Sequence, residues 1–493
     1  MKVISKCTGR AFCIKCITKF VATSVDRIRM AVLSANLPQS KISQGEPMQG
    51  ATEALADFVA KTTFADIPAG VIENAKLMML DTLGVILAAT RDPGCKLLAE
   101  WAKDQEAASR ATVIGQGFRT SPMLAALVNG HASHALDYDD SGHYSTQTLP
   151  VALALGEPAH VSGESILRAY ILGREVCARL DGAFDAGREK LTGPTYRGWH
   201  HTGTNGSLGA AAAAAVVQAL NAEQVRTAFG IAANGACGLR ANMGTMAKAL
   251  VSGNAARNGV MAATLAARGF TAEKSILETP QGIADAFCKD SDIDWQALTR
   301  DLGKRYELER GAITKEYPSC SPSHRPIEAV VQLVNQHGIR ADDVDWIECD
   351  PHSFSLRRQY ANDSHEGQYS LAYCLSVALL DGRMALSQMT DERVKAPDVQ
   401  TLMRRLRIVP PPDGPVERRP KERLTIHLKN GQAHSTEVSH ARRINKRADL
   451  EAKYFTCVEG SLSAEAARRL CDTVLGVENV NDISQVLAQV RGV

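Results

Sequence analysis

Four short stretches of the chain place histidines, carboxylates and one lysine beside glycines. They are residues 137–143, 198–203, 244–248 and 317–324. Histidine exchanges protons near neutral pH, and lysine holds a carboxylate as a compact positive charge. Several of these stretches precede helical patterns, and the free N–H groups of a helix start attract anions. Together they predict an acid–base site for a small anionic substrate, with no metal ion.

The first stretch allows three interpretations. His131, His134 and Asp137 follow one another at intervals of three residues, so they share a helix face if the helix continues. Histidines and acids at this spacing, with Asp140 nearby, suit a divalent metal ion. They also suit an acid–base pocket in which a carboxylate orients a histidine such as His143. The third interpretation is a helix end whose acids cap a solvated turn.

The second and third stretches hold one candidate each. His200 lies in Gly-Trp-His-His-Thr-Gly, ahead of an alanine-rich helical pattern that begins at Leu208. A histidine there can transfer a proton while the helix start holds an anion, although an ordinary glycine-rich cap has the same composition. Lys248 ends the sequence Gly-Thr-Met-Ala-Lys and is either a carboxylate partner or a solvated surface group.

The fourth stretch, Tyr-Pro-Ser-Cys-Ser-Pro-Ser-His, ends at His324. Its Cys320 has no base paired with it in the sequence pattern, so a nucleophilic role is not supported. Tyr360 and Arg240 are further candidates for substrate binding. Tyr360 follows the fourth stretch, and Arg240 lies just before Lys248.

These four stretches, in this order, resemble the MmgE/PrpD family of lyases. The family includes 2-methylcitrate dehydratases and cis-aconitate decarboxylases, with an iminodisuccinate epimerase on a related branch. The resemblance covers about residues 50–490. It implies that the catalytic residues are Asp137, His143, His200, Lys248 and His324, and that Ser141 and Thr202 contact the substrate.

The chain departs from the family pattern at several positions. Only two residues separate Asp140 from His143, where many members have a longer turn, and Tyr144 replaces the usual proline. His201 takes a position often held by proline, and Val251 one often held by histidine. The short turn changes the loop that carries His143, whereas Asp137 keeps its family context.

The resemblance implies a cofactor-free lyase that dehydrates or decarboxylates a small di- or tricarboxylate, such as 2-methylcitrate or cis-aconitate, by histidine and lysine acid–base catalysis. It also implies a homodimer. An epimerase or isomerase of a small dicarboxylate remains an alternative within the family. Two alternatives lie outside it: a divalent-metal hydrolase built on His131, His134, Asp137 and Asp140, and a non-catalytic helical binding protein.

The composition agrees with an enzyme of two domains. A chain of 493 residues is too long for one simple core. Its net charge of +2 does not indicate a nucleic-acid surface. No apolar run approaches the roughly 20 residues that span a bilayer, so we expect no membrane segment. No glycine-rich nucleotide motif opens a βαβ unit, and we expect no cofactor.

The elements that must position these residues are mainly helical. The resemblance, together with these patterns, predicts a mainly α protein, with a large all-helical domain at 48–312, a smaller α+β lid domain at 313–446, and C-terminal helices at 447–493 that return to the first domain. Alternation around Leu424 and Ile426, followed by Asn430-Gly431, predicts a hairpin with a two-residue turn. Helical patterns before the lid fall at 123–135, 165–180, 208–220, 222–234, 254–268 and 272–278.

The segment 1–47 differs from the rest because it is rich in lysine and arginine and almost free of acids. That composition is typical of a mitochondrial transit peptide, or of an over-extended start with Met48 as the true first residue. We expect a cytoplasmic protein, or a mitochondrial one if the segment is a genuine transit peptide.

Overall fold

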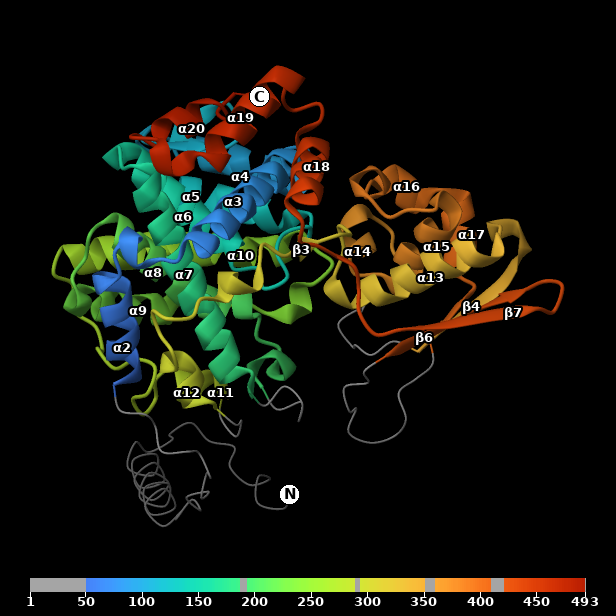
Figure 1. Ribbon diagram of the computed structural model, residues 1–493, viewed down its shortest axis with the longest axis horizontal. Helices are drawn as coiled ribbons and strands as arrows, with labels where there is room; N and C mark the ends of the chain where they lie inside the picture. Colours follow the sequence, from blue (N-terminus) through green and yellow to red (C-terminus); the bar gives the residue numbers. More distant parts are fainter. Residues whose placement is uncertain (1–49, 187–192, 289–292, 351–359, 409–420, 493) are drawn as a thin grey trace, which may run out of the picture. The chain divides into compact units, whose positions relative to one another are not determined.

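The computed structural model describes residues 50–492 except for 187–192, 289–292, 351–359 and 409–420 (Figure 1). The segment 1–47 lies outside the described residues. The described part is mainly helical, and its two largest clusters of buried apolar side chains form the cores of a large helical domain and a smaller α+β domain. Within this part, no helix is both long and apolar enough to cross a membrane.

Small side chains allow the central helices of the large domain to pack closely. Helix α8 (His201–Val217) buries the whole run Ala210–Ala215, and α10 (Ala247–Ala267) packs against it. A Cβ at Gly259 would lie 2.5 Å from the backbone carbon of Ala210, so this contact requires glycine. The other helices before the small domain are α2 (Ala51–Lys61), α3 (Ala69–Ala89), α4 (Pro93–Asp104), α5 (Pro122–Ala135), α6 (Ser145–Ala159), α7 (Gly163–Phe184), α9 (Ala222–Gly235), α11 (Ile283–Cys288) and α12 (Trp295–Thr299).

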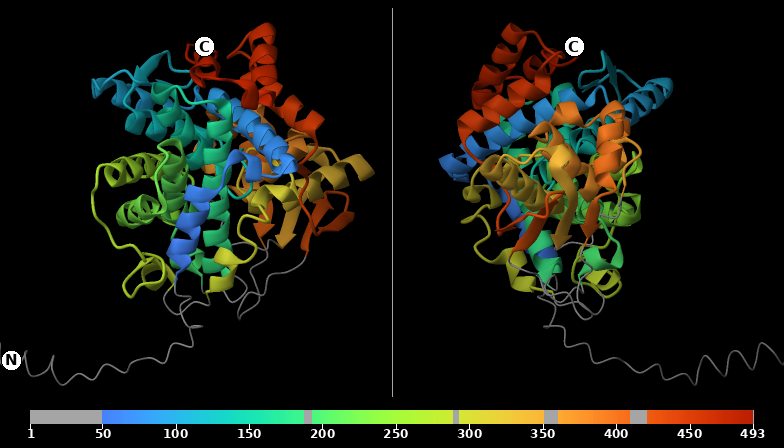
Figure 2. Two further views of the ribbon diagram at one scale, coloured as in Figure 1. Left: turned by 60° about the vertical axis from the view of Figure 1, so that its left-hand side comes forward. Right: turned by 90° about the vertical axis from the view of Figure 1, so that its right-hand side faces the viewer.

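The C-terminal helices return to the large domain, which is therefore discontinuous in sequence (Figure 2). Helix α18 (Arg447–Val458) packs on α3, and its Leu450 and Tyr454 are buried in the same core. Two short strands, β3 (Thr314–Lys315) and β8 (Arg443–Ile444), pair antiparallel where the chain leaves this domain and re-enters it. The chain ends in α19 (Ala464–Leu475) and α20 (Ser484–Ala488).

The small domain is a four-stranded sheet of order β5-β4-β6-β7 with helices packed on it. Leu424 and Ile426 of β6 are buried, while Thr425 and His427, which alternate with them, are partly exposed, as the sequence predicts. The elements are α13 (His324–His337), β4 (Val344–Asp350), α14 (Ser364–Gly367), α15 (Leu371–Asp381), α16 (Asp391–Lys395), α17 (Pro397–Met403), β5 (Leu406–Ile408), β6 (Glu422–Leu428) and β7 (Ala433–Val438).

The predicted hairpin is present, but its turn differs from the prediction. His427 pairs with Ala433, and the Leu428 N–H donates to the Gln432 carbonyl, so three residues form the loop rather than two. Gly431 adopts the left-handed conformation with φ of 86°. This is the usual position of glycine in a three-residue hairpin loop.

Three predicted helix assignments in the large domain also change. The segment 272–278 forms turns rather than a helix, because the Leu277 N–H and the Glu278 carboxylate are hydrogen-bonded to Thr52 of α2. Helices α8 and α10 begin at His201 and Ala247, each seven residues before the predicted starts at Leu208 and Asn254. In addition, β1 (Ala111–Val113) and β2 (Phe118–Thr120) form a hairpin too short to produce an alternating pattern.

Candidate functional site

The loop after α5 is held in shape by lysines from distant parts of the chain. Asp137 adopts a left-handed backbone with φ of 48°, which is uncommon for a residue other than glycine. Its carbonyl accepts a hydrogen bond from Lys315 Nζ at 2.9 Å, and the next carbonyl, of Tyr138, accepts one from Lys453 Nζ at 2.6 Å. Both lysines are buried. They satisfy backbone groups that the irregular loop leaves without secondary-structure partners.

The Asp137 side chain forms a buried charge cluster with two lysines. Its Oδ1 lies 2.5 Å from Lys248 Nζ, and its Oδ2 lies 3.1 Å from Lys315 Nζ. Burial alone would raise the pKa of Asp137, but the two ammonium groups hold it well below its usual value. Asp137 is therefore ionised at neutral pH, and the cluster of one carboxylate and two ammonium groups carries an excess positive charge.

The carboxylate that orients His143 is Asp139 rather than Asp137. His143 Nδ1 lies 2.5 Å from Asp139 Oδ2, and His134 Nδ1 lies 3.3 Å from Asp139 Oδ1. Burial raises the pKa of Asp139, but the two imidazoles more than reverse this effect and hold it well below its usual value. With Nδ1 bound to the carboxylate, Nε2 of His143 is the nitrogen that can exchange a proton with a substrate.

Helix α8 presents two histidines at its N-terminus. His200 is the N-cap residue, and its ring lies 5.4 Å from that of His201 and 6.5 Å from that of His143. A Cβ at Gly203 would lie 1.9 Å from the Cys237 carbonyl oxygen, so only glycine lets this helix start approach the segment before Lys248. Burial holds the pKa of His200 well below its usual value, so its imidazole is neutral at neutral pH.

Two polar atoms in this helix start have no hydrogen-bond partner among the described residues. They are Nδ1 of His200 and the hydroxyl of Thr202, and both residues are almost fully buried. A buried polar atom without a partner costs about 1–3 kcal/mol, a cost that a bound substrate can remove. The free atoms therefore agree with the predicted roles of His200 and Thr202.

Lys248 lies in the first turn of α10, and the small domain covers it with Tyr369. Lys248 Nζ lies 5.7 Å from the centre of the Tyr369 ring and 3.4 Å from His134 Nδ1. Burial, followed by the charge of Asp137, raises the pKa of the Tyr369 hydroxyl well above its usual value, so it stays protonated. Nearby, the Gln368 side chain donates to the Ala135 carbonyl at 2.9 Å, which ties the small domain to α5.

Sequence reasoning assigned no catalytic role to Asp139, Lys315 or Tyr369, and it named His134 only as a ligand of the alternative metal site. Asp139 belongs to the recognised Asp-Tyr-Asp-Asp stretch, and Tyr369 begins a family-like Tyr-Ser-Leu sequence. The resemblance could therefore have indicated both residues. Lys315 carried none beyond its position two residues before Tyr317.

His324 is placed differently from the other predicted histidines. Its Nδ1 accepts a hydrogen bond from Arg443 at 2.8 Å, and its Nε2 lies 3.1 Å from the Ser319 carbonyl. Burial, followed by the charges of Arg443 and Lys315, holds the pKa of His324 well below its usual value. Both ring nitrogens are thus engaged by the protein, and in this arrangement His324 orders the start of α13 and the segment before it.

The remaining predicted substrate contacts are Tyr360, Arg240 and Ser141. The Tyr360 side chain is 39% exposed, and its ring lies 5.7 Å from the Arg404 guanidinium. Burial raises the pKa of the Cys320 thiol to about 12, and the charge of Arg240, in a short 3-10 turn, offsets part of that rise. Ser141 is exposed and faces a neighbouring cavity.

The metal site considered from the sequence is not formed. His131 lies close to Asp92 and Cys95, whereas His134 contacts Asp139 and Lys248. Asp140 forms an ion pair with Arg174 at 2.9 Å, and its carboxylate accepts hydrogen bonds from backbone N–H groups at the start of α6. Asp140 therefore stabilises the loop between α5 and α6.

A different set of side chains, His134, Asp137, Asp139 and His143, is close enough to hold an ion. Two ammonium groups already neutralise Asp137, and they would repel a cation in that position. The arrangement suits an anion better than a metal ion.

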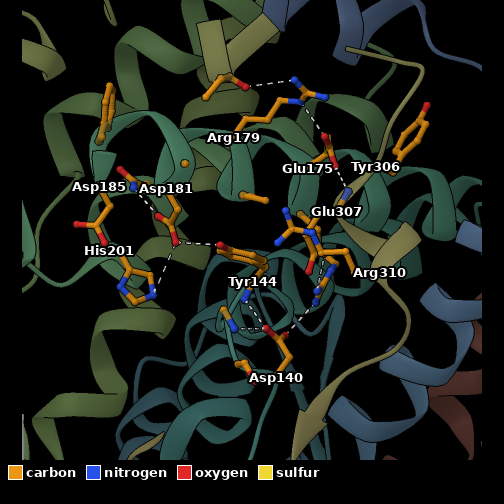
Figure 3. A pocket seen from close by; sticks show the side chains of 18 of the residues that line it. Asp140, Tyr144, Glu175, Arg179, Asp181, Asp185, His201, Tyr306, Glu307 and Arg310 are labelled. Carbon is orange, nitrogen blue, oxygen red and sulfur yellow. Dashed lines mark hydrogen bonds and ion pairs between the residues drawn. The ribbon is translucent and has the colours of Figure 1, made fainter. Parts of the chain in front are cut away.

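A cavity of about 910 Å³ lies beside this cluster, and His201 is part of its wall (Figure 3). Tyr144 donates to Asp181 at 3.0 Å inside it, and Arg174 binds Glu307 at 3.0 Å. The described residues that line it include seven carboxylates and five arginines. Since the acids outnumber the arginines, this cavity suits a polyanion less well than the lysine cluster does.

Comparison with known proteins assigns both parts of the chain to one protein family. The MmgE/PrpD N-terminal domain matches residues 53–296, and the MmgE/PrpD C-terminal domain matches residues 317–479. Cis-aconitate decarboxylase from Mus musculus is 28% identical over 468 residues, which cover 90% of this chain and 94% of that protein. The Aspergillus terreus decarboxylase is 27% identical over 89% of this chain and 95% of its own. The 2-methylcitrate dehydratase of Escherichia coli (strain K12) is 25% identical over 65% of this chain and 69% of its own.

Proposed function

The chain belongs to the MmgE/PrpD family, and we propose that it is a lyase that removes CO₂ or water from a small tricarboxylate without a cofactor. Cis-aconitate is the first substrate to test. Cis-aconitate decarboxylase of Mus musculus matches 90% of the chain, whereas the Escherichia coli 2-methylcitrate dehydratase matches 65%. The observation that carries the proposal is the pairing of an excess of buried positive charge at Lys248 with an oriented histidine, His143.

Lys248 binds a substrate carboxylate in this proposal. Lys248 and Lys315 share the single charge of Asp137, so a second carboxylate can enter without leaving an unpaired buried anion. The start of α8 adds N–H groups and the Thr202 hydroxyl as further donors. These donors favour a substrate with at least two carboxylates and stabilise the enolate-like charge that develops on one of them.

His143 transfers the proton at carbon. In a decarboxylation the bond to the leaving carboxylate breaks, and its electron pair forms a new double bond to the neighbouring carbon. The electrons of the existing double bond move to its far carbon, which takes a proton. In a dehydration the carbon next to a carboxylate loses a proton, and the hydroxyl group leaves as water with a proton from an acid. Asp139 fixes Nδ1 of His143 in either case, and His200 and Tyr369 are the second proton carriers.

The direct test is a substrate screen with product analysis by NMR. The purified full chain would be incubated with cis-aconitate, 2-methylcitrate, citrate and iminodisuccinate, with and without a chelator. We expect turnover of a tricarboxylate that survives chelation and is lost in His143→Asn. Epimerisation of iminodisuccinate alone would replace the lyase by an epimerase. Loss of turnover in chelator, restored by one divalent ion, would favour metal-dependent chemistry. The resemblance also leads us to expect a homodimer, which light scattering can check.

A further inference from the structure

A second polar cluster lies one turn earlier on α5 than His134, next to the catalytic histidines. His131 is one helical turn before His134, but it faces α4 and the small domain rather than Lys248. Its imidazole is 3% exposed, and neither ring nitrogen has a hydrogen-bond partner among the described residues. At least one ring nitrogen of a buried imidazole normally forms a hydrogen bond or binds a metal ion. The His131 imidazole has no such partner among the described residues.

The side chains nearest to His131 are ones that bind transition metals. Asp92 is the N-cap residue of α4, and Cys95 lies in the first turn of the same helix. One carboxylate oxygen, the Cys95 sulfur and one imidazole nitrogen all lie within 4.8 Å of one another. Sulfur, imidazole and carboxylate together are typical ligands of Zn²⁺. This ligand set therefore favours Zn²⁺ over Mg²⁺ or Ca²⁺.

We propose that Asp92, Cys95 and His131 form a Zn²⁺ site that is separate from the catalytic cluster. Three protein ligands leave a fourth tetrahedral position for water or another small ligand. The thiolate and the carboxylate together cancel the charge of the ion, so the buried complex is neutral overall. This is the condition under which a buried cation is tolerated.

The proton balance of binding is simple. Burial, followed by the charge of Asp92, raises the pKa of the Cys95 thiol well above its usual value, so the metal-free site holds a thiol. When the ion binds, the S–Zn bond forms and the thiol proton leaves to solvent. Burial lowers the pKa of His131 to about 4, so its imidazole is already neutral and releases no proton near neutral pH. One proton is therefore released for each ion bound.

His365 of the small domain orients the carboxylate of this site. Its Nε2 lies 3.0 Å from Asp92 Oδ2, and both side chains are largely buried. A hydrogen bond from outside the ligand set fixes the direction of a ligand, and its loss typically costs about 10–100-fold in metal affinity. His365 lies on α14, four residues before Tyr369, so the ion would join α4 and α5 to the segment that covers Lys248.

The test is metal binding to the full chain after chelator treatment and dialysis. We expect one Zn²⁺ per chain by calorimetry and elemental analysis, and a rise in melting temperature that grows with free Zn²⁺. Co²⁺ in place of Zn²⁺ should give the thiolate charge-transfer absorption that marks a cysteine ligand. Cys95→Ser should abolish that absorption, and His131→Gln should abolish stoichiometric binding.

Cys320→Ser is the matched control, because Cys320 is the buried thiol near the catalytic cluster. It should keep the Co²⁺ absorption in full. His365→Gln should bind Zn²⁺ about 10–100-fold more weakly. Absence of stoichiometric binding to the folded wild-type chain would overturn the proposal. So would a cobalt spectrum that survives Cys95→Ser but disappears in Cys320→Ser. None of these readouts requires catalytic activity, so they remain informative if the proposed lyase function is wrong.

Discussion

His143 Nδ1 lies 2.5 Å from the Oδ2 of Asp139, a residue four positions earlier in the chain. Asp139 is almost fully buried, and the same carboxylate also contacts His134, so it holds two imidazoles in fixed orientations. Neither histidine can rotate without breaking a buried charged hydrogen bond. The catalytic importance of His143 therefore depends on Asp139 as much as on the histidine itself.

Asp139→Asn should lower kcat by about 10²-fold or more while the protein stays folded, because the amide does not stabilise an imidazolium as a carboxylate does. The measurement is steady-state turnover beside thermal melting. Asp482→Asn is the matched control, since Asp482 forms the same kind of pair with the exposed His160 at 2.8 Å. Equal activity in the two variants would remove Asp139 from the mechanism.

Replacement of Lys248 should act mainly on substrate binding. Lys248→Ala should raise KM for a tricarboxylate more than Lys248→Arg does, because arginine keeps a positive partner for the carboxylate. Asp137 retains Lys315 in both variants, which limits the loss of stability. Small and equal effects on KM would show that no substrate carboxylate reaches Lys248.

His200 and His324 should respond differently to alanine substitution. His200→Ala should lower kcat by about 10²–10⁴-fold with little change in melting temperature, since its Nδ1 has no described partner to lose. His324→Ala breaks bonds to Arg443 and Ser319, so it should lower the melting temperature. A large loss of kcat in His324→Ala at unchanged stability would restore His324 as a direct proton carrier.

Buried neutral histidines should make the protein less stable in mild acid. Burial, followed by the charge of Lys248, lowers the pKa of His134 to about 3, against 6.5 for the unfolded chain. Between these values the unfolded state binds more protons, so the free energy of unfolding falls as pH falls. The slope from this group is at most about 1.4 kcal/mol per pH unit.

Melting temperatures measured from pH 7.5 down to pH 4.5 test this expectation. His134→Asn should flatten the decline, whereas substitution of the exposed His160 by Asn should leave it unchanged. Asp137 and Asp139 have lowered pKa values, so their contribution is lost only at still lower pH. A wild-type melting temperature that is constant over this range would contradict the buried neutral state of His134.

A chain that begins at Met48 should fold and keep its activity. The first described helix, α2, starts at Ala51 and buries Ala51 and Leu55 in the main core, so this truncation leaves it intact. Melting temperature and turnover of the truncated and full chains provide the comparison. An insoluble or inactive product would mean that residues before Met48 belong to the fold, and the targeting or mis-start interpretation would fail.

The sequence alone determined the fold class and most of the stretches that supply the site. Helical periodicity depends on neighbours three and four residues apart, so it indicated α5, α8 and α10 without tertiary information. The alternation in β6 and the glycine after Asn430 indicated the hairpin for the same local reason. The segment 272–278 was predicted wrongly because distant hydrogen bonds to Thr52 overrode its local preference.

Only the tertiary structure decided which side chains act together. His131 and His134 are three residues apart, yet they belong to different clusters, because α4 supplies the neighbours of one and α10 supplies Lys248 to the other. The partners of Asp137 come from 111 and 178 positions away, as Lys248 and Lys315. Sequence spacing fixes the direction of a side chain around its own helix axis. What that side chain meets depends on the packing of elements far apart in the chain, which no local pattern encodes.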